Sequence, residues 1–226
     1  MPIRGRLPLA TKVQSVVEWR FPNAHAYWDD PGKLMTRIEE AHPALKCTGL
    51  KPDGFHFERA GQQPVSASFY WNKAAVTWPS DDKGQLAQFA QTFWESVCDV
   101  LRPSSVDRVG HRLWLCYEMA NGSAEALQWL EGKSLWAFAD GDRGRDVGTP
   151  SLAGTVLRTK LADGRRRLRL EINAGTLQSV GKEYRGVIVD ADFVVEKPSP
   201  APTSIADFIN SNAEFARRTI EPLFRS

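Results

Sequence analysis

The sequence predicts an α+β protein in which antiparallel sheets pack against long helices. Short segments with alternating apolar and polar residues, separated by Gly, Pro, Asn or Asp, are typical of half-buried antiparallel strands. Two longer segments place apolar residues at every third or fourth position, which is typical of amphipathic helices. The order strand, helix, several strands, long helix occurs twice along the chain. The sequence therefore predicts two repeats of one unit.

The first half contains one strand, one helix, four short strands and one long helix. Asp30 is a good N-cap and Pro31 suits the first helical position, so we expect a helix to begin there. Pro103 follows the long helix and ends it. The expected strands are residues 11–21, 45–50, 55–60, 65–71 and 75–78, and the expected helices are residues 31–41 and 85–101.

The second half follows the same order. Ser123 is expected to cap a short helix whose inward residues are Ala126, Leu127 and Leu130, and Ser204 to cap the last helix. Asp163 and Gly164 form a strong hairpin signal. The expected strands are residues 107–119, 154–161, 166–173 and 184–195. Residues 1–104 would thus be one repeat and residues 105–226 the other, either as two domains or as one continuous domain.

Composition places the chain among ordinary globular proteins, with 42% apolar and 25% charged residues. It has no run of apolar residues long enough for a membrane span and no signal-peptide pattern, so we expect a cytoplasmic protein without membrane contact. Cys47, Cys98 and Cys116 are odd in number and widely spaced. This argues against a disulfide framework and favours buried, inert thiols.

Established catalytic motifs are missing from the sequence. It has no phosphate-binding loop, no nucleophile elbow and no zinc-protease motif. The acidic loop from Asp140 to Asp146 resembles a calcium loop but has Ser151 where the bidentate glutamate belongs. We therefore expect no metal, no cofactor and no catalytic residue. The alternative is an enzyme with a dispersed site, for which Asp190, Asp192 and His111 are the candidates.

The second half is rich in arginine around the Asp163–Gly164 turn. Such a cluster suits phosphates or an acidic partner surface, because guanidinium groups bind oxyanions through paired hydrogen bonds. The candidate ligand-binding or nucleic-acid-binding residues are Arg108, Arg112, Trp114, Arg158, Lys160, Arg167 and Arg169. Two alternatives remain open: Asp190 and Asp192 neutralise the basic residues in a cross-strand charge ladder, or these two carboxylates bind Mg²⁺. The net charge of +2 gives no support to nucleic-acid binding by the whole chain.

Four aromatic residues lie in segments without a clear helix or strand pattern. These are Tyr27, Trp28, Trp136 and Phe138. Aromatic side chains dominate binding energy where they are exposed, so we expect them to contact a partner.

Two stretches carry a resemblance to a known family. Residues 106–113 read Val-Asp-Arg-Val-Gly-His-Arg-Leu just after a long helix, and residues 187–193 read Val-Ile-Val-Asp-Ala-Asp-Phe before a connector and a terminal helix. In these stretches and in length the chain resembles a sporadically distributed bacterial family of uncharacterised proteins, often encoded near mobile or defence genes. Its element order is also similar to the duplicated fold of the TATA-box-binding protein. The resemblance implies no catalytic residues.

Taken together, these patterns predict a non-catalytic binding protein of the bacterial accessory genome, in a phage-defence or toxin–antitoxin-like setting. It would recognise a partner protein or a small ligand at the cleft between the repeats. The alternatives are a nucleic-acid-binding protein that uses the arginine-rich hairpin of residues 158–169, and an enzyme with a dispersed site.

Overall fold

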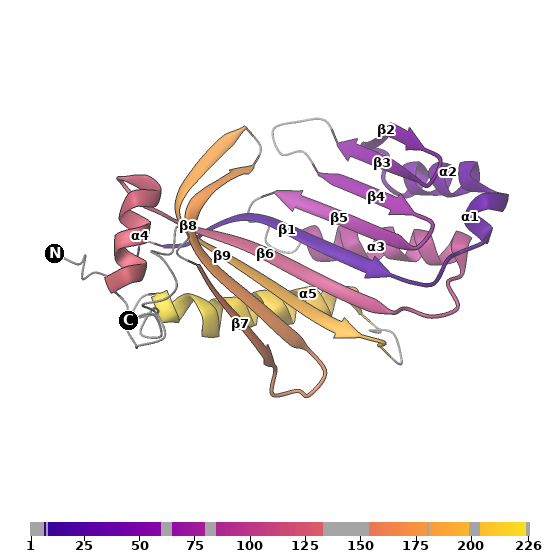
Figure 1. Ribbon diagram of the computed structural model, residues 1–226. Coiled ribbons are helices and arrows are strands. Elements are labelled where there is room, and N and C mark those ends of the chain that lie inside the picture. The colour runs from indigo at the N-terminus through magenta and orange to yellow at the C-terminus, as the bar shows by residue number, and fades with distance from the viewer. Residues whose placement is uncertain are drawn as a thin grey trace, which may run out of the picture.

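The computed structural model describes residues 7, 9–59, 65–79, 85–132, 154–179, 181–198 and 204–224 (Figure 1). Its nine strands form one sheet in the order β2-β3-β4-β5-β1-β6-β9-β8-β7. The strands are β1 (Thr11–Arg20), β2 (Leu45–Lys51), β3 (Gly54–Arg59), β4 (Ser66–Tyr70), β5 (Lys73–Pro79), β6 (Arg108–Glu118), β7 (Gly154–Lys160), β8 (Arg167–Ser179) and β9 (Lys182–Glu196). The helices are α1 (Ala26–Asp29), α2 (Pro31–Ala41), α3 (Gln85–Leu101), α4 (Gly122–Gly132) and α5 (Ile205–Phe215). The predicted α+β class with antiparallel pairing is confirmed.

The sheet is antiparallel at every pairing, and its centre is the contact between β1 and β6. Val17 on β1 lies opposite Val76 of β5 on one side and His111 of β6 on the other. Strands from both halves of the sequence therefore share one continuous hydrogen-bonded sheet.

Local signals account well for the helix starts in α2 and α5. Asp30 accepts a hydrogen bond from the backbone N–H of Lys33 at 3.2 Å, and Pro31 occupies the first turn. Ser204 accepts a hydrogen bond from the backbone N–H of Asp207 at 3.0 Å. Both side chains satisfy N–H groups that a helix start leaves without partners.

The helix after β6 differs from its prediction. It begins at Gly122, whose φ of +63° suits glycine, so Ser123 lies inside the first turn instead of capping it. Leu127 is 37% exposed, whereas Trp129 is buried and its ring lies 6.1 Å from that of Phe224. Ala126 and Leu130 are buried as predicted, so only Leu127 is replaced on the buried side, by Trp129. The C-terminal segment gives Trp129 a partner that the local sequence does not reveal.

Strand β8 is longer than the sequence predicts. It continues through Ala174 and Gly175 to Ser179, and Gly175 lies opposite Gly186 of β9. Glycine is a poor strand residue, so the pattern predicts an end near Asn173. The long β8–β9 hairpin holds these glycines in the sheet because its pairing continues on both sides of them.

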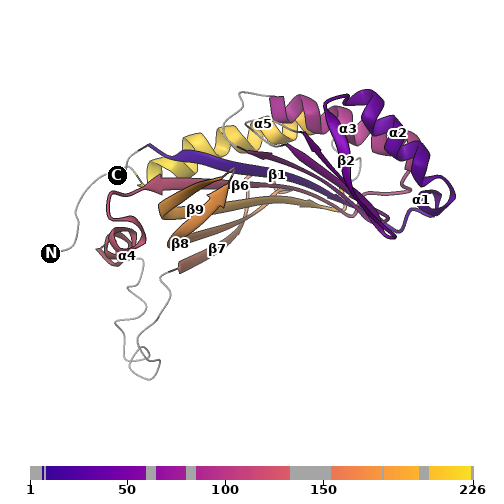
Figure 2. The ribbon, with the colours of Figure 1, turned by 90° about the horizontal axis from the view of Figure 1, so that it is seen from above.

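One face of the sheet is covered by helices, as the view from above shows (Figure 2). There α2, α3 and α5 lie along the same side, and their apolar residues join those of the strands in one core. Trp19 of β1 stacks on Trp94 of α3 with ring centroids 5.2 Å apart, and Phe193 of β9 meets Phe215 of α5 at 5.8 Å. The buried alternate residues of each strand point to this side.

The other face, here called the open face, carries no long helix (Figure 2). At one end it has a small apolar cluster, formed by Val13, Trp114, Cys116, Leu177, Tyr184 and Ile188. Beyond this cluster, the open face of β6, β9, β8 and β7 is charged. No helix within the described ranges is long and apolar enough to cross a membrane.

Cysteine chemistry follows the prediction in part. All three thiols are free, and Cys116 is fully buried, but Cys47 and Cys98 are only half-buried. Burial raises the pKa of Cys98 to about 11 and that of Cys116 to about 12, and nearby carboxylates add to both shifts.

Candidate functional site on the open sheet face

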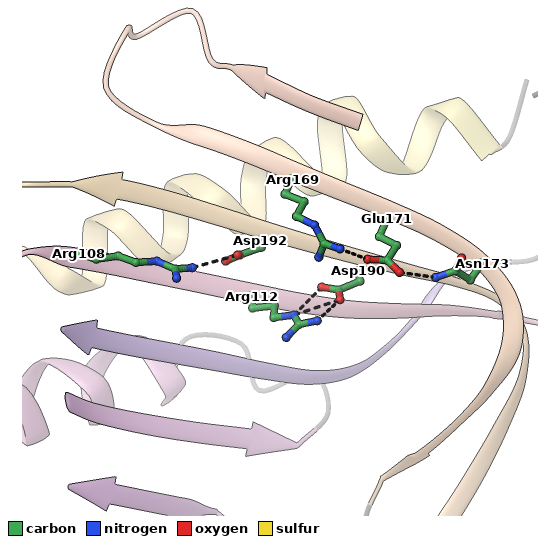
Figure 3. Close-up of polar contacts among 7 residues, drawn as sticks. All are labelled: Arg108, Arg112, Arg169, Glu171, Asn173, Asp190 and Asp192. Atoms are coloured by element: carbon green, nitrogen blue, oxygen red, sulfur yellow. Dashed lines mark hydrogen bonds and ion pairs between the residues drawn. The ribbon is translucent and has the colours of Figure 1, made fainter. Parts of the chain in front are cut away.

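The strand register brings the arginines and the aspartates together on the open face. Asp192 of β9 lies directly between Arg112 of β6 and Arg169 of β8. Asp190, two residues earlier, lies between Trp114 and Glu171. Side chains two residues apart in a strand share a face, so these residues form one charged surface across three strands (Figure 3).

Two ion pairs link β6 to β9. Arg112 donates from Nε to both carboxylate oxygens of Asp190, at 2.8 and 3.1 Å, and also from Nη2. Arg108 donates from Nη2 to Asp192 at 3.1 Å. The Arg112 guanidinium also lies 4.4 Å from the ring centroid of Trp114 (Figure 3 shows the two ion pairs). Because Asp190 and Asp192 lie in strongly desolvated positions, these contacts fix both arginines on the sheet.

The charge ladder therefore exists, but its main partners differ from the expected ones. In one of the alternatives open from the sequence, Asp190 and Asp192 neutralise basic residues of the β7–β8 hairpin; in the structure they bind arginines of β6. Arg169 turns to Glu171 on its own strand, and Arg167 pairs with Glu196 at 2.9 Å. Strand β8 separates β7 from β9, and Arg169, although it lies directly opposite Asp192, binds Glu171 instead.

The local environment shifts the pKa values of three groups in this network. The hydrogen bond to Asp190 is the main cause that raises the pKa of Arg112. Burial raises the pKa of Asp192, although Arg108 and Arg112 act in the opposite direction. A hydrogen bond from Asn173 at 3.0 Å, followed by the charge of Arg169, lowers the pKa of Glu171. The lowered pKa of Glu171 favours a negative charge beside Arg169.

The β7–β8 hairpin places like charges opposite each other. Arg158 lies directly across from Arg169, and Lys160 directly across from Arg167. The turn between the strands is held by Asp163, which accepts hydrogen bonds from the backbone N–H groups of the next two arginines at 2.9 and 3.0 Å. Arg158 and Lys160 form no ion pair with any residue that the structure describes. Directly opposed like charges destabilise a strand pair, and the ion pairs of Arg169 with Glu171 and of Arg167 with Glu196 offset part of this repulsion.

A shallow groove of about 480 Å³ lies over these residues. It is lined by Arg108, Arg158, Thr159, Lys160, Arg167, Leu168, Arg169, Asp192, Val194 and Glu196. Five of the seven predicted binding residues border it. Arg112 and Trp114 lie beyond it on β6, where Arg112 binds Asp190 and its guanidinium lies over the Trp114 ring. The sequence analysis missed Glu196, which the strand alternation of β9 places on the same face as Asp190 and Asp192.

The four candidate aromatics do not act as one surface. Tyr27 is 3% exposed and packs against Phe55 and Phe69, so it belongs to the core. Trp28 is 56% exposed, and it lines an apolar pocket of about 590 Å³ with Met35 and Leu50. Both lie in the short helix α1 and not in an irregular segment. Trp136 and Phe138 lie outside the described residues.

The candidate catalytic residues point to different sides of the sheet. His111 is fully buried and lies opposite Phe193 on the helix-covered side, where its ring is 6.4 Å from that of Phe208. Asp190 and Asp192 project to the open face and bind arginines. The three groups therefore do not converge on one substrate position. Among the described residues, no three His, Cys, Asp or Glu side chains gather as a metal site requires.

Comparison with known proteins adds no functional assignment: no family model and no curated protein matches the chain.

Proposed function

We propose that the chain is a non-catalytic binding protein that recognises an anionic partner on the open face of its sheet. The observation that carries this proposal is the pair of like-charge contacts between β7 and β8, Arg158 with Arg169 and Lys160 with Arg167. Such contacts reduce the stability of the folded chain, by less than about 1 kcal/mol each because Glu196 and Glu171 already pair with Arg167 and Arg169. An anion in the groove would remove the repulsion, and binding to it would stabilise the fold.

The strand order supports the idea that the chain is a duplicated unit. The first half contributes β2-β3-β4-β5-β1 and the second contributes β6-β9-β8-β7, so β1 and β6 meet at the centre of the sheet. Each half begins with its central strand and ends with a helix. In this proposal residues 1–104 and 105–226 are repeats, and the charged face of the second repeat extends to the seam between them. The setting that we propose is the bacterial accessory genome, on the family resemblance alone.

A titration with a fluorescent peptide of eight glutamates tests the proposal. We expect the anisotropy to rise on binding, and the affinity to fall with added salt because the contacts are electrostatic. The double variant Arg158→Glu with Lys160→Glu should abolish the signal. The matched control is Lys46→Glu with Lys51→Glu on β2, at the opposite edge of the sheet, where both lysines are also exposed. No binding by the wild type, or equal losses in both variants, would rule out the proposed face.

Nucleic acid is the second candidate ligand, because a row of cations crosses one end of the open face. Lys73 of β5 lies opposite Arg20 of β1, and Arg20 lies opposite Arg108 of β6. These residues line a second groove of about 740 Å³ beside Lys197. A single-stranded DNA of twenty nucleotides tests this candidate. If it is correct, affinity falls steeply with salt, and Arg20→Glu with Lys73→Glu abolishes binding.

A further inference from the structure

The outer edge of β7 differs from the other edge of the sheet. Within the described residues, β7 pairs only with β8, and β2, at the far side, pairs only with β3. The pairing of β2 is interrupted between Cys47 and Gly49, which is a common way to prevent edge strands from pairing with other chains. The pairing of β7 with β8 runs without interruption from Gly154 to Lys160. Strand β7 thus presents a regular backbone edge that an added strand can extend.

The side chains of β7 are exposed on both faces of the strand from Val156 to Lys160. Val156 is 46% exposed and Leu157 is 51% exposed, which is unusual for apolar residues of a strand in a folded sheet. Arg158, Thr159 and Lys160 are also exposed. An edge strand that is regular and carries exposed apolar side chains tends to pair with another chain, because that pairing buries the apolar groups and satisfies the free backbone N–H and C=O groups. Val156 and Leu157 therefore indicate a contact surface.

The two faces of β7 have different chemistry. Arg158 and Lys160 lie on the open face, beside Arg169 and Arg167. Leu157 lies on the opposite face, next to Leu170. An extended segment that paired with β7 would therefore meet cations on one side and an apolar neighbour on the other.

The ion pairs that the cations near β7 already form favour an acidic peptide over a nucleic acid as the partner. Arg108, Arg167 and Arg169 already bind carboxylates, whereas Arg158 and Lys160 bind none among the described side chains. These two stand at alternate positions of one strand, about 6.6 Å apart along it. Two carboxylates at alternate positions of an adjacent strand match this spacing. The phosphate backbone of a nucleic acid gains less binding energy here, because most cations near β7 are already neutralised by carboxylates.

We propose that β7 binds an extended acidic segment of a partner protein as an additional strand of the sheet. The segment carries acidic side chains at alternate positions toward Arg158 and Lys160, and apolar side chains between them toward Leu157. This inference rests on the proposed function, and it narrows the anionic partner to a peptide whose backbone pairs with β7.

The test compares three labelled peptides of eight residues. The first alternates glutamate and valine, the second has the same composition with its four glutamates in one block, and the third is the alternating peptide with N-methylated backbone amides. The alternating peptide should bind at least about tenfold more tightly than either of the other two, because only it combines the charge spacing with backbone donors. Hydrogen exchange of the β7 amides should slow when it binds.

Variants and competing ligands complete the test. Arg158→Glu with Lys160→Glu should weaken binding of the alternating peptide by about tenfold or more, while Lys46→Glu with Lys51→Glu should leave it unchanged. If all three peptides bind equally, strand addition is wrong and only the anionic face stands. If the twenty-nucleotide DNA binds and the alternating peptide does not, the partner is nucleic acid and this inference is overturned. If neither peptide nor DNA binds, the proposed function fails as well.

Discussion

Arg112 holds the carboxylate of Asp190 from the neighbouring strand. Its Nε donates to both oxygens at 2.8 and 3.1 Å, and Asp190 is only 8% exposed. A carboxylate at this depth is stable as an anion only with a charged hydrogen-bond donor beside it. The pair joins β6 to β9, so it belongs to the structure of the sheet as well as to the charge pattern of the open face.

Removing Arg112 should therefore destabilise the fold. We expect Arg112→Ala to lower the free energy of unfolding by about 2 kcal/mol, which is less than the loss for a fully buried pair because Arg112 is itself half-exposed. Urea unfolding followed by tryptophan fluorescence measures the change.

Two controls separate this effect from ordinary truncation. The double variant Arg112→Ala with Asp190→Asn should recover part of the lost unfolding free energy, because an uncharged amide replaces the buried carboxylate that Arg112→Ala leaves without a partner. Arg185→Ala, which removes an exposed pair with Glu183, should leave stability close to that of the wild type, because solvent screens the pair. An equal loss in Arg112→Ala and in the double variant would show that the charge of Asp190 is unimportant.

The glycine pair in the β8–β9 hairpin gives a second prediction. A Cβ added at Gly186 would lie 2.0 Å from the carbonyl oxygen of Tyr117, whereas one added at Gly175, directly opposite, would meet nothing within 4 Å. We expect Gly186→Ala to cost about 2 to 4 kcal/mol, since backbone must move, and Gly175→Ala to stay within about 0.5 kcal/mol of the wild type. Thermal unfolding compares the two variants. Similar melting temperatures would show that the clash relaxes at little cost.

The sequence predicts most elements of this fold because their signals are local. The cap at Asp30, the stripe of α3 and the alternation of β4 each lie within a few residues of chain. The exposure of Leu127 and the extension of β8 are not predictable in this way, because they depend on Phe224 and on the pairing with β9. Such contacts between distant segments leave no periodic pattern.

In the candidate site, too, the local sequence predicts some features, and others depend on contacts between distant segments. Alternation along the strands identifies which arginines share a face with each other and with Asp190 and Asp192. It does not give the neighbours of β9, and these decide that Arg108 and Arg112 bind the aspartates. The order of strands in a sheet is set by tertiary packing, so the partners became visible only in the structure.

The pH dependence of stability should reveal the hydrogen-bonded state of Glu171. Its pKa is lowered in the folded chain, so its contribution is present above the ordinary carboxyl pKa of about 4.3 and is lost as the pH falls through the folded value. Glu171→Gln should lower the free energy of unfolding by about 1 kcal/mol at pH 7 and by less as the pH approaches 4. Urea titrations across this range measure the difference. A constant difference at all pH values would contradict the assignment.

The contribution of Asp192 to stability should change with pH in the opposite direction to that of Glu171. Burial raises its pKa in the folded chain, so its contribution to stability is largest when it is protonated and declines as the pH rises through the folded value. Asp192→Asn should therefore gain stability relative to the wild type as the pH rises from 4 toward 7, by less than about 1 kcal/mol because Arg108 offsets part of the penalty. A loss at pH 7 as large as that of Arg112→Ala would show that the ion pair outweighs burial.

Thiol labelling tests whether the core around β6 is closed. Cys116 is fully buried with a pKa of about 12, and Cys98 is half-buried with a pKa of about 11, so both are almost entirely protonated at pH 8. Since the thiolate is the reactive form, iodoacetamide at pH 8 should leave Cys116 unmodified and modify Cys98 slowly. Raising the pH to 9.5 should speed the reaction of Cys98 but not that of Cys116, which also lacks access. Peptide mass spectrometry assigns the modified residues, and labelling in 8 M urea is the control that all three thiols react. Rapid modification of Cys116 in the folded chain would show that the apolar end of the open face opens to solvent.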